Sequence, residues 1–154
     1  MSSTTYDMIS MDLGRNGALA IWKDNICVDI RSWSFKNTYV IQDLTKVWNI
    51  WVDIIMDNRP IVSVESPSRQ MPIQWILYSD LRKMCISFNL EFNGYKPPMI
   101  KKTVTGYGRA DKDDMKASVL EGEWLTEGLM PKDEHEFDAV GCGICYLKKN
   151  GMVK

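Results

Sequence analysis

Acidic side chains stand at three places where the surrounding sequence is apolar. Asp12 interrupts the run that begins at Met8, Glu65 closes the β-branched run "IVSVE", and Asp138 lies within "FDAVGCGIC". A buried, unpaired carboxylate costs free energy, so it persists where a cation or a polar partner neutralises it. The alternative for Asp12 is that it begins a surface turn at Gly14. The three acids therefore raise the hypothesis of a metal or phosphate site.

A histidine near Asp138 could complete such a site. His135, the single histidine of the chain, lies three residues before Asp138, and Glu134 lies four before it, so either can share its helix face. A lone histidine is more often structural or exposed than a ligand. Asp, Glu, Asp and His from separate elements would nevertheless be enough for two metal ions about 4 Å apart, the spacing of many nucleases. Oxygen ligands of this kind suit Mg²⁺ or Mn²⁺.

The elements that must position these residues follow from turn residues and hydrophobic spacing. Residues 7–13, 17–22 and 26–33 are predicted as strands of an antiparallel meander, because "GRNG" and "KDN" are turn sequences. Apolar spacing of three and four predicts helices, and short β-branched runs predict strands. The remaining predicted elements are a helix over 38–58, a strand over 59–66, a helix over 73–89, a strand over 90–98, and helices over 110–125 and 134–150.

This order of elements predicts an α/β fold with a mixed sheet and right-handed crossovers. If the strands that end at Asp12 and Glu65 lie side by side and parallel, both carboxylates reach the edge where ligands of open α/β sheets collect. Two carboxylates that close repel each other unless a cation lies between them. Gly14 and Gly17 would let the backbone turn tightly beside this site.

Length and composition restrict the class of protein. The 154 residues suit one domain, 1–154, and 45% hydrophobic with 25% charged residues is typical of a soluble globular protein. No run approaches 18 apolar residues and the first residues lack a signal peptide, so we expect a cytoplasmic protein without a membrane span. Cys142 and Cys145 form a CxxC without a second ligand pair, which favours close helix packing over a zinc site.

Charge is distributed unevenly along the chain. The formal net charge is −1, which does not indicate a nucleic-acid partner. Residues 94–112, called the basic strip below, carry five basic residues against Asp111, a local charge of +4. Such a cluster is more often a solvated face than a binding surface, so it is weak evidence by itself. The basic residues of the strip are Lys96, Lys101, Lys102, Arg109 and Lys112.

Four motifs occur in an order that resembles one known family. "SMDLG", "VSVES", "IKKTVTGYGRADK" and "HEFDAVGCGIC" resemble the RuvC family of Holliday-junction resolvases, within the ribonuclease H-like superfamily. "TVTGYGRADK" followed by "HxxDA" is quite specific, whereas "DLG" also occurs in sugar-kinase and actin-like folds. The resemblance implies an α/β ribonuclease H-like fold, with a five-stranded mixed sheet flanked by helices, in a single nuclease domain.

The resemblance also implies an activity. The chain would be an endodeoxyribonuclease that resolves four-way DNA junctions by paired metal-dependent nicks, acting as a homodimer. Two Mg²⁺ ions per site would be the cofactors, with Mn²⁺ able to substitute. By position, the metal ligands would be Asp12, Glu65, Asp138 and, at the fourth position, His135, and the phosphate-contacting lysines would be Lys101 and Lys112.

The remaining DNA contacts are expected at Lys102, Arg109 and Arg69. Relatives carry an aromatic residue in the loop after the glutamate, where it probes the junction centre. Here that loop reads "SPSRQMPIQW", without an aromatic residue before Trp75, so Arg69 or Gln70 would take its place.

Several alternatives stay open at the level of sequence. The substrate could be other branched DNA or an RNA–DNA hybrid, or the protein could bind junctions without cutting them. Glu134 competes with His135 for the fourth position. The helix with Trp48 and Trp51 could form part of a dimer surface, or both tryptophans could pack on the sheet of their own subunit.

Overall fold

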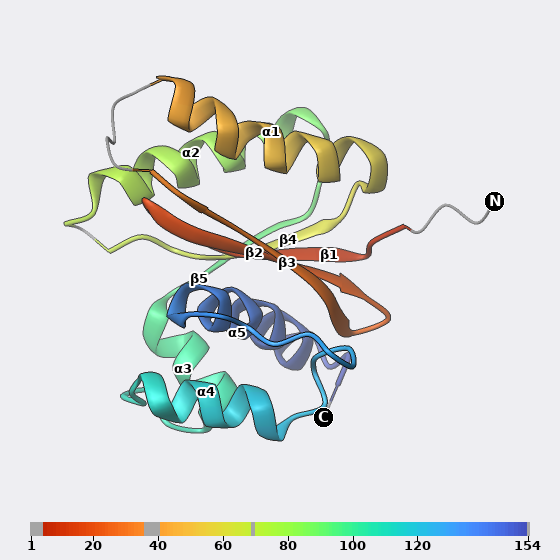
Figure 1. Cartoon of the computed structure of the whole chain (residues 1–154), viewed down its shortest axis with the longest axis vertical. Coiled ribbons are helices and arrows are strands. Elements are labelled where there is room, and N and C mark those ends of the chain that lie inside the picture. Colours follow the sequence, from red (N-terminus) through yellow and green to blue (C-terminus); the bar gives the residue numbers. More distant parts are fainter. Residues whose placement is uncertain (1–4, 36–40, 69, 154) are drawn as a thin grey trace.

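The computed structural model describes residues 5–35, 41–68 and 70–153. A central sheet lies between two layers of helices, with α1 and α2 above it and α5, α3 and α4 below it (Figure 1). The strands are β1 (Met8–Asp12), β2 (Asn16–Lys23), β3 (Ile26–Ser34), β4 (Ile61–Glu65) and β5 (Phe92–Tyr95). The helices are α1 (Ile41–Asn58), α2 (Pro72–Ser87), α3 (Pro97–Thr105), α4 (Lys112–Glu121) and α5 (Glu134–Lys149).

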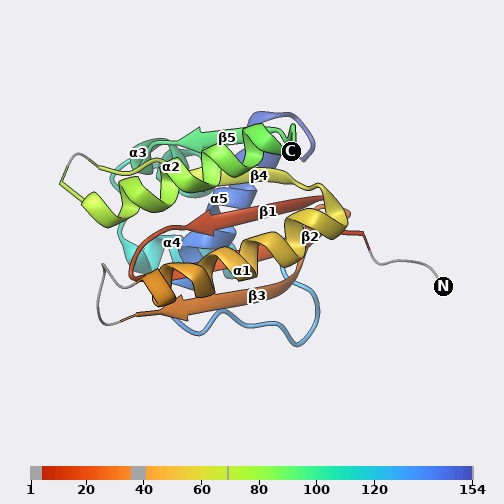
Figure 2. The same cartoon turned by 90° about the horizontal axis from the view of Figure 1, so that it is seen from above.

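The sheet has five strands in the order β3-β2-β1-β4-β5, which Figure 2 shows from above. β1 pairs antiparallel with β2, and β2 with β3, whereas β4 runs parallel to both β1 and β5. The predicted meander, the mixed sheet and the parallel pairing of the strands that carry Asp12 and Glu65 are therefore confirmed.

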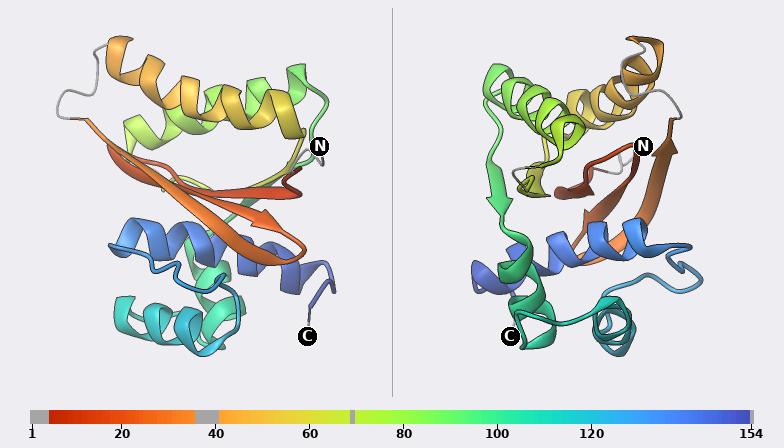
Figure 3. Two further views of the ribbon diagram at one scale, coloured as in Figure 1. Left: turned by 45° about the vertical axis from the view of Figure 1, so that its right-hand side comes forward. Right: turned by 90° about the vertical axis from the view of Figure 1, so that its left-hand side faces the viewer.

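Side chains of β1 alternate between two apolar cores. Ile9 and Met11 join the core under α1 and α2, while Met8 joins the core formed with α5, so Ser10 and Asp12 also face α5. All five residues of β1 are buried, as expected for a strand covered on both faces. α5 lies directly against the sheet, and α3 and α4 lie beyond it (Figure 3).

One helix was missing from the sequence prediction. α3 begins at Pro97 and ends before Gly106, which takes a left-handed φ of 86°. Proline at the first helical position, buried Ile100 and Val104 four residues apart, and a C-terminal glycine are ordinary helix signals. The basic strip thus contains a helix, so its basic side chains point in several directions instead of forming one extended face.

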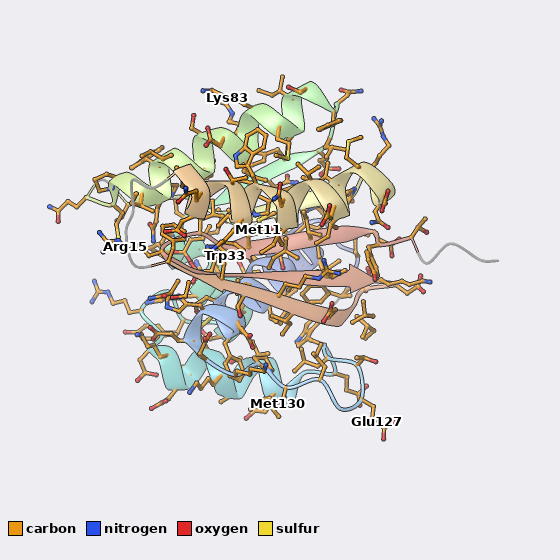
Figure 4. All side chains as sticks on the ribbon, turned by 45° about the horizontal axis from the view of Figure 1, so that its top comes forward. Met11, Arg15, Trp33, Lys83, Glu127 and Met130 are labelled. Atoms are coloured by element: carbon orange, nitrogen blue, oxygen red, sulfur yellow. The ribbon has the colours of Figure 1, made fainter. Side chains whose placement is uncertain are left out.

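The expected role of Gly14 and Gly17 is corrected by the local backbone and packing. Gly14 and Gly17 do not take positive φ, so their role is not conformational freedom in a turn. A Cβ at Gly17 would lie 2.4 Å from the ring of Trp33, so a close approach excludes a side chain there. Trp33 also donates from Nε1 to the carbonyl of Gly14 at 2.9 Å, beside Arg15 at the end of the sheet (Figure 4).

Trp51 and the two cysteines of the CxxC pack as the structural alternatives predicted, whereas Trp48 does not. Trp51 is fully buried and its ring centroid is 6.3 Å from that of Trp33, so it packs on the sheet of its own subunit, whereas Trp48 is 39% exposed. Cys142 and Cys145 are buried and free, on the face of α5 that packs on the sheet. Within the described residues, no helix is long and apolar enough to cross a bilayer.

Candidate active site

The carboxyl ends of β1 and β4 form the floor of the candidate site. The parallel register pairs Met11 with Val64, and Asp12 and Glu65 are the next residue on each strand. Asp12 is 8% exposed and Glu65 is half-buried. The position outside the carboxyl ends of parallel strands is where ligands of open α/β sheets bind.

The first turns of α5 supply the side chains above this floor. Asp133 caps the helix by accepting a hydrogen bond from the N–H of Glu136 at 3.0 Å. His135 follows two residues later, and its Nδ1 lies 2.9 Å from Oδ2 of Asp12. The structure therefore joins two of the predicted site residues, which are 123 positions apart in the chain, by a direct contact.

Two cavities adjoin these residues. One, of about 200 Å³, is lined by Glu65, Asp138, Lys101 and Lys112, among others. This cavity brings together four of the six predicted catalytic residues. Lys112, the first residue of α4, also forms an ion pair with Glu134 of α5.

The second cavity, of about 380 Å³, lies on the other side of Asp12 and His135. Its remaining walls come from the turn after β1 and from the start of α2, and include Asn16, Gln70 and Gln74. The sequence reasoning considered only Gln70 among these amides. The signal that could have found Asn16 and Gln74 is their place at the start of the elements that follow Asp12 and Glu65.

Burial and mutual repulsion disfavour the charged forms of the acids. Burial raises the pKa of Asp12 to about 6 against the hydrogen bond from His135, and the charge of Asp138 adds to the rise. Burial, together with the charges of Asp12 and Asp138, raises the pKa of Glu65 to about 8. Burial also raises the pKa of Asp138. The charge of Asp138 thus acts on both Asp12 and Glu65, and the charge of Asp12 acts on Glu65.

The pKa of His135 is raised as well, but for this base the rise favours the charged form. Burial alone would lower its pKa, but the hydrogen bond and negative charge of Asp12 outweigh burial, so the pKa of His135 is raised. The cationic form of His135 is therefore favoured beside Asp12.

The donor set fits a hard divalent cation by its chemistry. Asp12, Glu65 and Asp138 offer carboxylate oxygens, and a cation among them would offset the repulsion that raises their pKa values. In the described part of the chain, no three His, Cys, Asp or Glu side chains already stand in a metal-binding arrangement.

In the structure, Glu134 and His135 contact different side chains. Glu134 is held by Lys112, which lowers its pKa, and Nε2 of His135 is 3.8 Å from Oε1 of Glu134. His135 reaches Asp12 directly. The geometry brings His135, rather than Glu134, to the acids of the floor.

The other predicted DNA contacts are not part of either cavity. Lys102 and Arg109 are exposed and line neither one. Arg69 lies outside the described residues. The roles predicted for these three residues stay predictions.

Solved structures resemble this fold along almost the whole chain. A structure of Thermus thermophilus RuvC superposes with a TM-score of 0.76 at 16% identity, covering 94% of this chain and 95% of that one. The structure of T. thermophilus RuvC in complex with Holliday junction substrate gives a TM-score of 0.77 at 17% identity, covering 96% of both chains. The chain has the RuvC fold. The predicted ribonuclease H-like architecture is thereby confirmed.

Curated RuvC sequences match shorter parts of the chain. The crossover junction endodeoxyribonuclease RuvC of Caldicellulosiruptor saccharolyticus is 35% identical over 69 residues, which cover 45% of this chain and 40% of the relative. RuvC of Finegoldia magna is 36% identical over 63 residues, or 41% of this chain and 37% of the relative. The match thus spans about two fifths of these relatives, and no family model matches. The resemblance to RuvC seen in the motifs is confirmed.

Proposed function

We propose that this chain is a structure-selective endonuclease that resolves four-way DNA junctions by metal-dependent nicks. One observation carries the proposal: carboxylates from β1, β4 and α5 lie at the carboxyl edge of a RuvC fold, close enough that the charges of Asp12 and Asp138 add to the burial that raises the pKa of Glu65. Asp12, Glu65 and Asp138 occupy the positions that the motif resemblance assigns to the metal-binding acids. A relative of this fold has been solved with Holliday junction substrate.

The cofactors are proposed to be two Mg²⁺ ions, for which Mn²⁺ can substitute. Asp12, Glu65 and Asp138 would hold them, with His135 at the fourth position. Bound there, the ions would supply a lowered pKa for the attacking water and charge stabilisation for the phosphate and the leaving oxygen. No covalent enzyme intermediate is required.

The chain's own cations and proton carriers have separate proposed roles. Lys101 and Lys112 line the cavity of Glu65 and Asp138, where they would hold a phosphate and offset its charge. Lys112 would exchange its ion pair with Glu134 for that phosphate. His135 contacts Asp12 through Nδ1, and its raised pKa means that it must give up a proton before its ring can bind a metal ion. Lys102 and Arg109 would contact DNA farther from the site.

A homodimer is proposed because a junction needs two opposed nicks. A two-fold dimer with one site in each subunit provides both. Trp48 on α1, at 39% exposure, is a candidate for the subunit contact, whereas Trp51 is committed to the core. Sedimentation of the wild-type chain and of Trp48→Ala tests the assembly.

The proposed place of action is the cytoplasm. The four cysteines are free and buried, which suits a reducing compartment. A protein that acts on DNA would meet its substrate there in a cell without a nucleus.

The decisive experiment is incubation with a synthetic four-way junction and Mg²⁺, with the products separated on a denaturing gel. We expect paired nicks at opposed strands and no cutting of a linear duplex of the same sequence. Cleavage of an RNA–DNA hybrid in preference to the junction would instead indicate a ribonuclease H-like activity. Tight binding without cleavage in Mg²⁺ or Mn²⁺ would indicate a junction-binding protein.

A further inference from the structure

Two serines lie buried beneath the carboxylates and are not used by the proposed chemistry. Ser10 on β1 and Ser63 on β4 are both 0% exposed and are partners in the parallel register. Each lies two residues before a site acid on its own strand, Asp12 or Glu65. Because side chains alternate along a strand, each serine shares the α5-facing side of the sheet with that acid.

Both hydroxyls bond to the backbone of α5. Ser10 Oγ donates to the carbonyl of Ala139 at 2.6 Å, and Ser63 Oγ donates to the carbonyl of Cys142 at 2.8 Å. Ala139 is the residue directly after Asp138. The strand of Asp12 is thus tied to the residue after Asp138, and the strand of Glu65 is tied to the same helix three residues farther on.

The packing around these bonds explains why such ties are needed. α5 faces the sheet with small residues, Ala139, Cys142 and Gly143, and a Cβ at Gly143 would lie 2.3 Å from the ring of Trp22. A smooth apolar face resists sliding and rotation less than a directional hydrogen bond does. Trp22 Nε1 donates to Ser10 Oγ at 2.8 Å, so the ring on Gly143 also fixes the serine hydroxyl.

We infer that Ser10 and Ser63 are positioning residues that set the register of α5 on the sheet and thereby hold Asp138 and His135 opposite Asp12 and Glu65. Two ties, three residues apart on the helix, fix both its rotation and its height. This inference rests on the proposed function, because it assigns the serines a part in building the same metal site.

The test uses Ser63→Ala first, because it removes one tie while the Cys142 carbonyl remains in the helix. Ser10→Ala is the second variant, although it also takes the acceptor from Trp22. Ser87→Ala is the matched control, since its hydroxyl donates to the Lys83 carbonyl at 2.9 Å on an exposed helix away from the site. Ser63→Cys retains a weak donor of similar size and carries the test should Ser63→Ala not fold.

Two readouts separate positioning from general stability. Mn²⁺ affinity is measured by titration calorimetry without DNA, and the single-turnover cleavage rate is measured on the four-way junction across Mg²⁺ concentrations. We expect Ser63→Ala and Ser10→Ala to bind Mn²⁺ several-fold more weakly and to cut about tenfold more slowly at limiting Mg²⁺, because small misplacements of reacting groups are costly. High Mg²⁺ restores much of the rate, Ser63→Cys is intermediate, and Ser87→Ala matches wild type.

The inference would be overturned if Ser63→Ala and Ser10→Ala had the Mn²⁺ affinity and cleavage rate of the wild type. If only Ser63→Cys folds, the same result in that variant would overturn it. The serines would then have a structural role only. A loss of rate that Mg²⁺ does not restore, with Mn²⁺ affinity unchanged, would overturn it as well. Absence of junction cleavage by the wild type would refute the proposed function instead. In that case the Mn²⁺ titration still decides whether the serines position the acids.

Discussion

Asp12 is the residue on which the site can be tested most directly, because it is the most buried of its acids and the one that His135 contacts. Asp12→Asn removes a negative oxygen ligand and should abolish junction cleavage in Mg²⁺. It also lessens repulsion of phosphates, so junction affinity in a gel-shift assay should be unchanged or higher. Asp53→Asn, the same change at an exposed position, should cut like wild type. Cutting by Asp12→Asn at a rate near wild type would refute the metal-site assignment.

The competition between His135 and Glu134 is also settled at this scale. His135 contacts Asp12 while Glu134 pairs with Lys112, so His135→Ala should lower the single-turnover rate more than Glu134→Ala. His135→Asp should retain activity and shift its preference toward Mg²⁺, which favours oxygen over nitrogen ligands. A larger loss in Glu134→Ala than in His135→Ala would make Glu134 the fourth residue.

Adjacent lysines on α3 give a matched pair for the phosphate contacts. Lys101 lines the cavity of Glu65 and Asp138, whereas Lys102 is exposed and lines neither cavity. Lys101→Ala should slow cleavage strongly, while Lys102→Ala should change binding and little else. For each lost phosphate contact, the slope of log affinity against log salt should fall by about one unit. Equal cleavage rates in the two variants would leave Lys101 as an ordinary surface charge.

At the scale of elements, the sequence was sufficient to predict the strands and their pairing wherever apolar patterning and turn residues agree. The meander and the parallel pairing of β1 with β4 follow from short apolar runs, and that pairing places Asp12 beside Glu65. α3 was missed because the basic residues on its surface obscured a weak apolar pattern of two buried positions, Ile100 and Val104. Asn16 and Gln74, which line the cavity beside Asp12, were not predicted, since the approach of the start of β2 to the start of α2 depends on tertiary packing.

The contact of α5 with the sheet provides a matched pair of glycine variants. A Cβ at Gly143 would lie 2.3 Å from the Trp22 ring, while at Gly141 the nearest atom, at 2.8 Å, is the flexible end of Met115. Gly143→Ala should therefore destabilise the fold by about 1–3 kcal/mol, as overpacking does. Gly141→Ala should cost less, because the flexible end of Met115 can move aside whereas the Trp22 ring cannot, and both variants gain the same helix propensity. Urea unfolding measures both, and equal effects would contradict the described helix–sheet contact.

For the whole molecule, the net charge of −1 does not show that basic and acidic residues are grouped locally. Lys101 and Lys112 lie at the cavity with Glu65 and Asp138, so a small region of the chain holds opposite charges that offset one another in the total. The net charge is therefore a poor guide to whether this chain binds DNA, because the acids of the site and the basic residues around it cancel in the net charge.

The same acids should make the stability of the whole protein depend on pH and on divalent cations together. The pKa of Glu65 is raised from 4.5 to about 8, and that of Asp12 from 3.8 to about 6. At any pH between the ordinary and the raised pKa of a group, the folded protein binds more protons at that group than the unfolded chain does. The free energy of unfolding that these groups contribute must then fall as pH rises through this window. A divalent cation that binds the charged forms opposes this fall, and its stabilisation grows with pH.

Calorimetry in EDTA and in Mg²⁺, from pH 5 to pH 8, measures both effects. We expect the increase in Tm caused by Mg²⁺ to be small at the acidic end and to grow as Asp12 and then Glu65 ionise. Other groups titrate in the same range, so the comparison that isolates Glu65 is the wild type against Glu65→Gln. In that variant the Mg²⁺ effect should be smaller and should depend less on pH above about 6, the pKa of Asp12. A Mg²⁺ shift that is independent of pH, or that is the same in Glu65→Gln, would mean that Mg²⁺ stabilises the protein elsewhere than at these carboxylates.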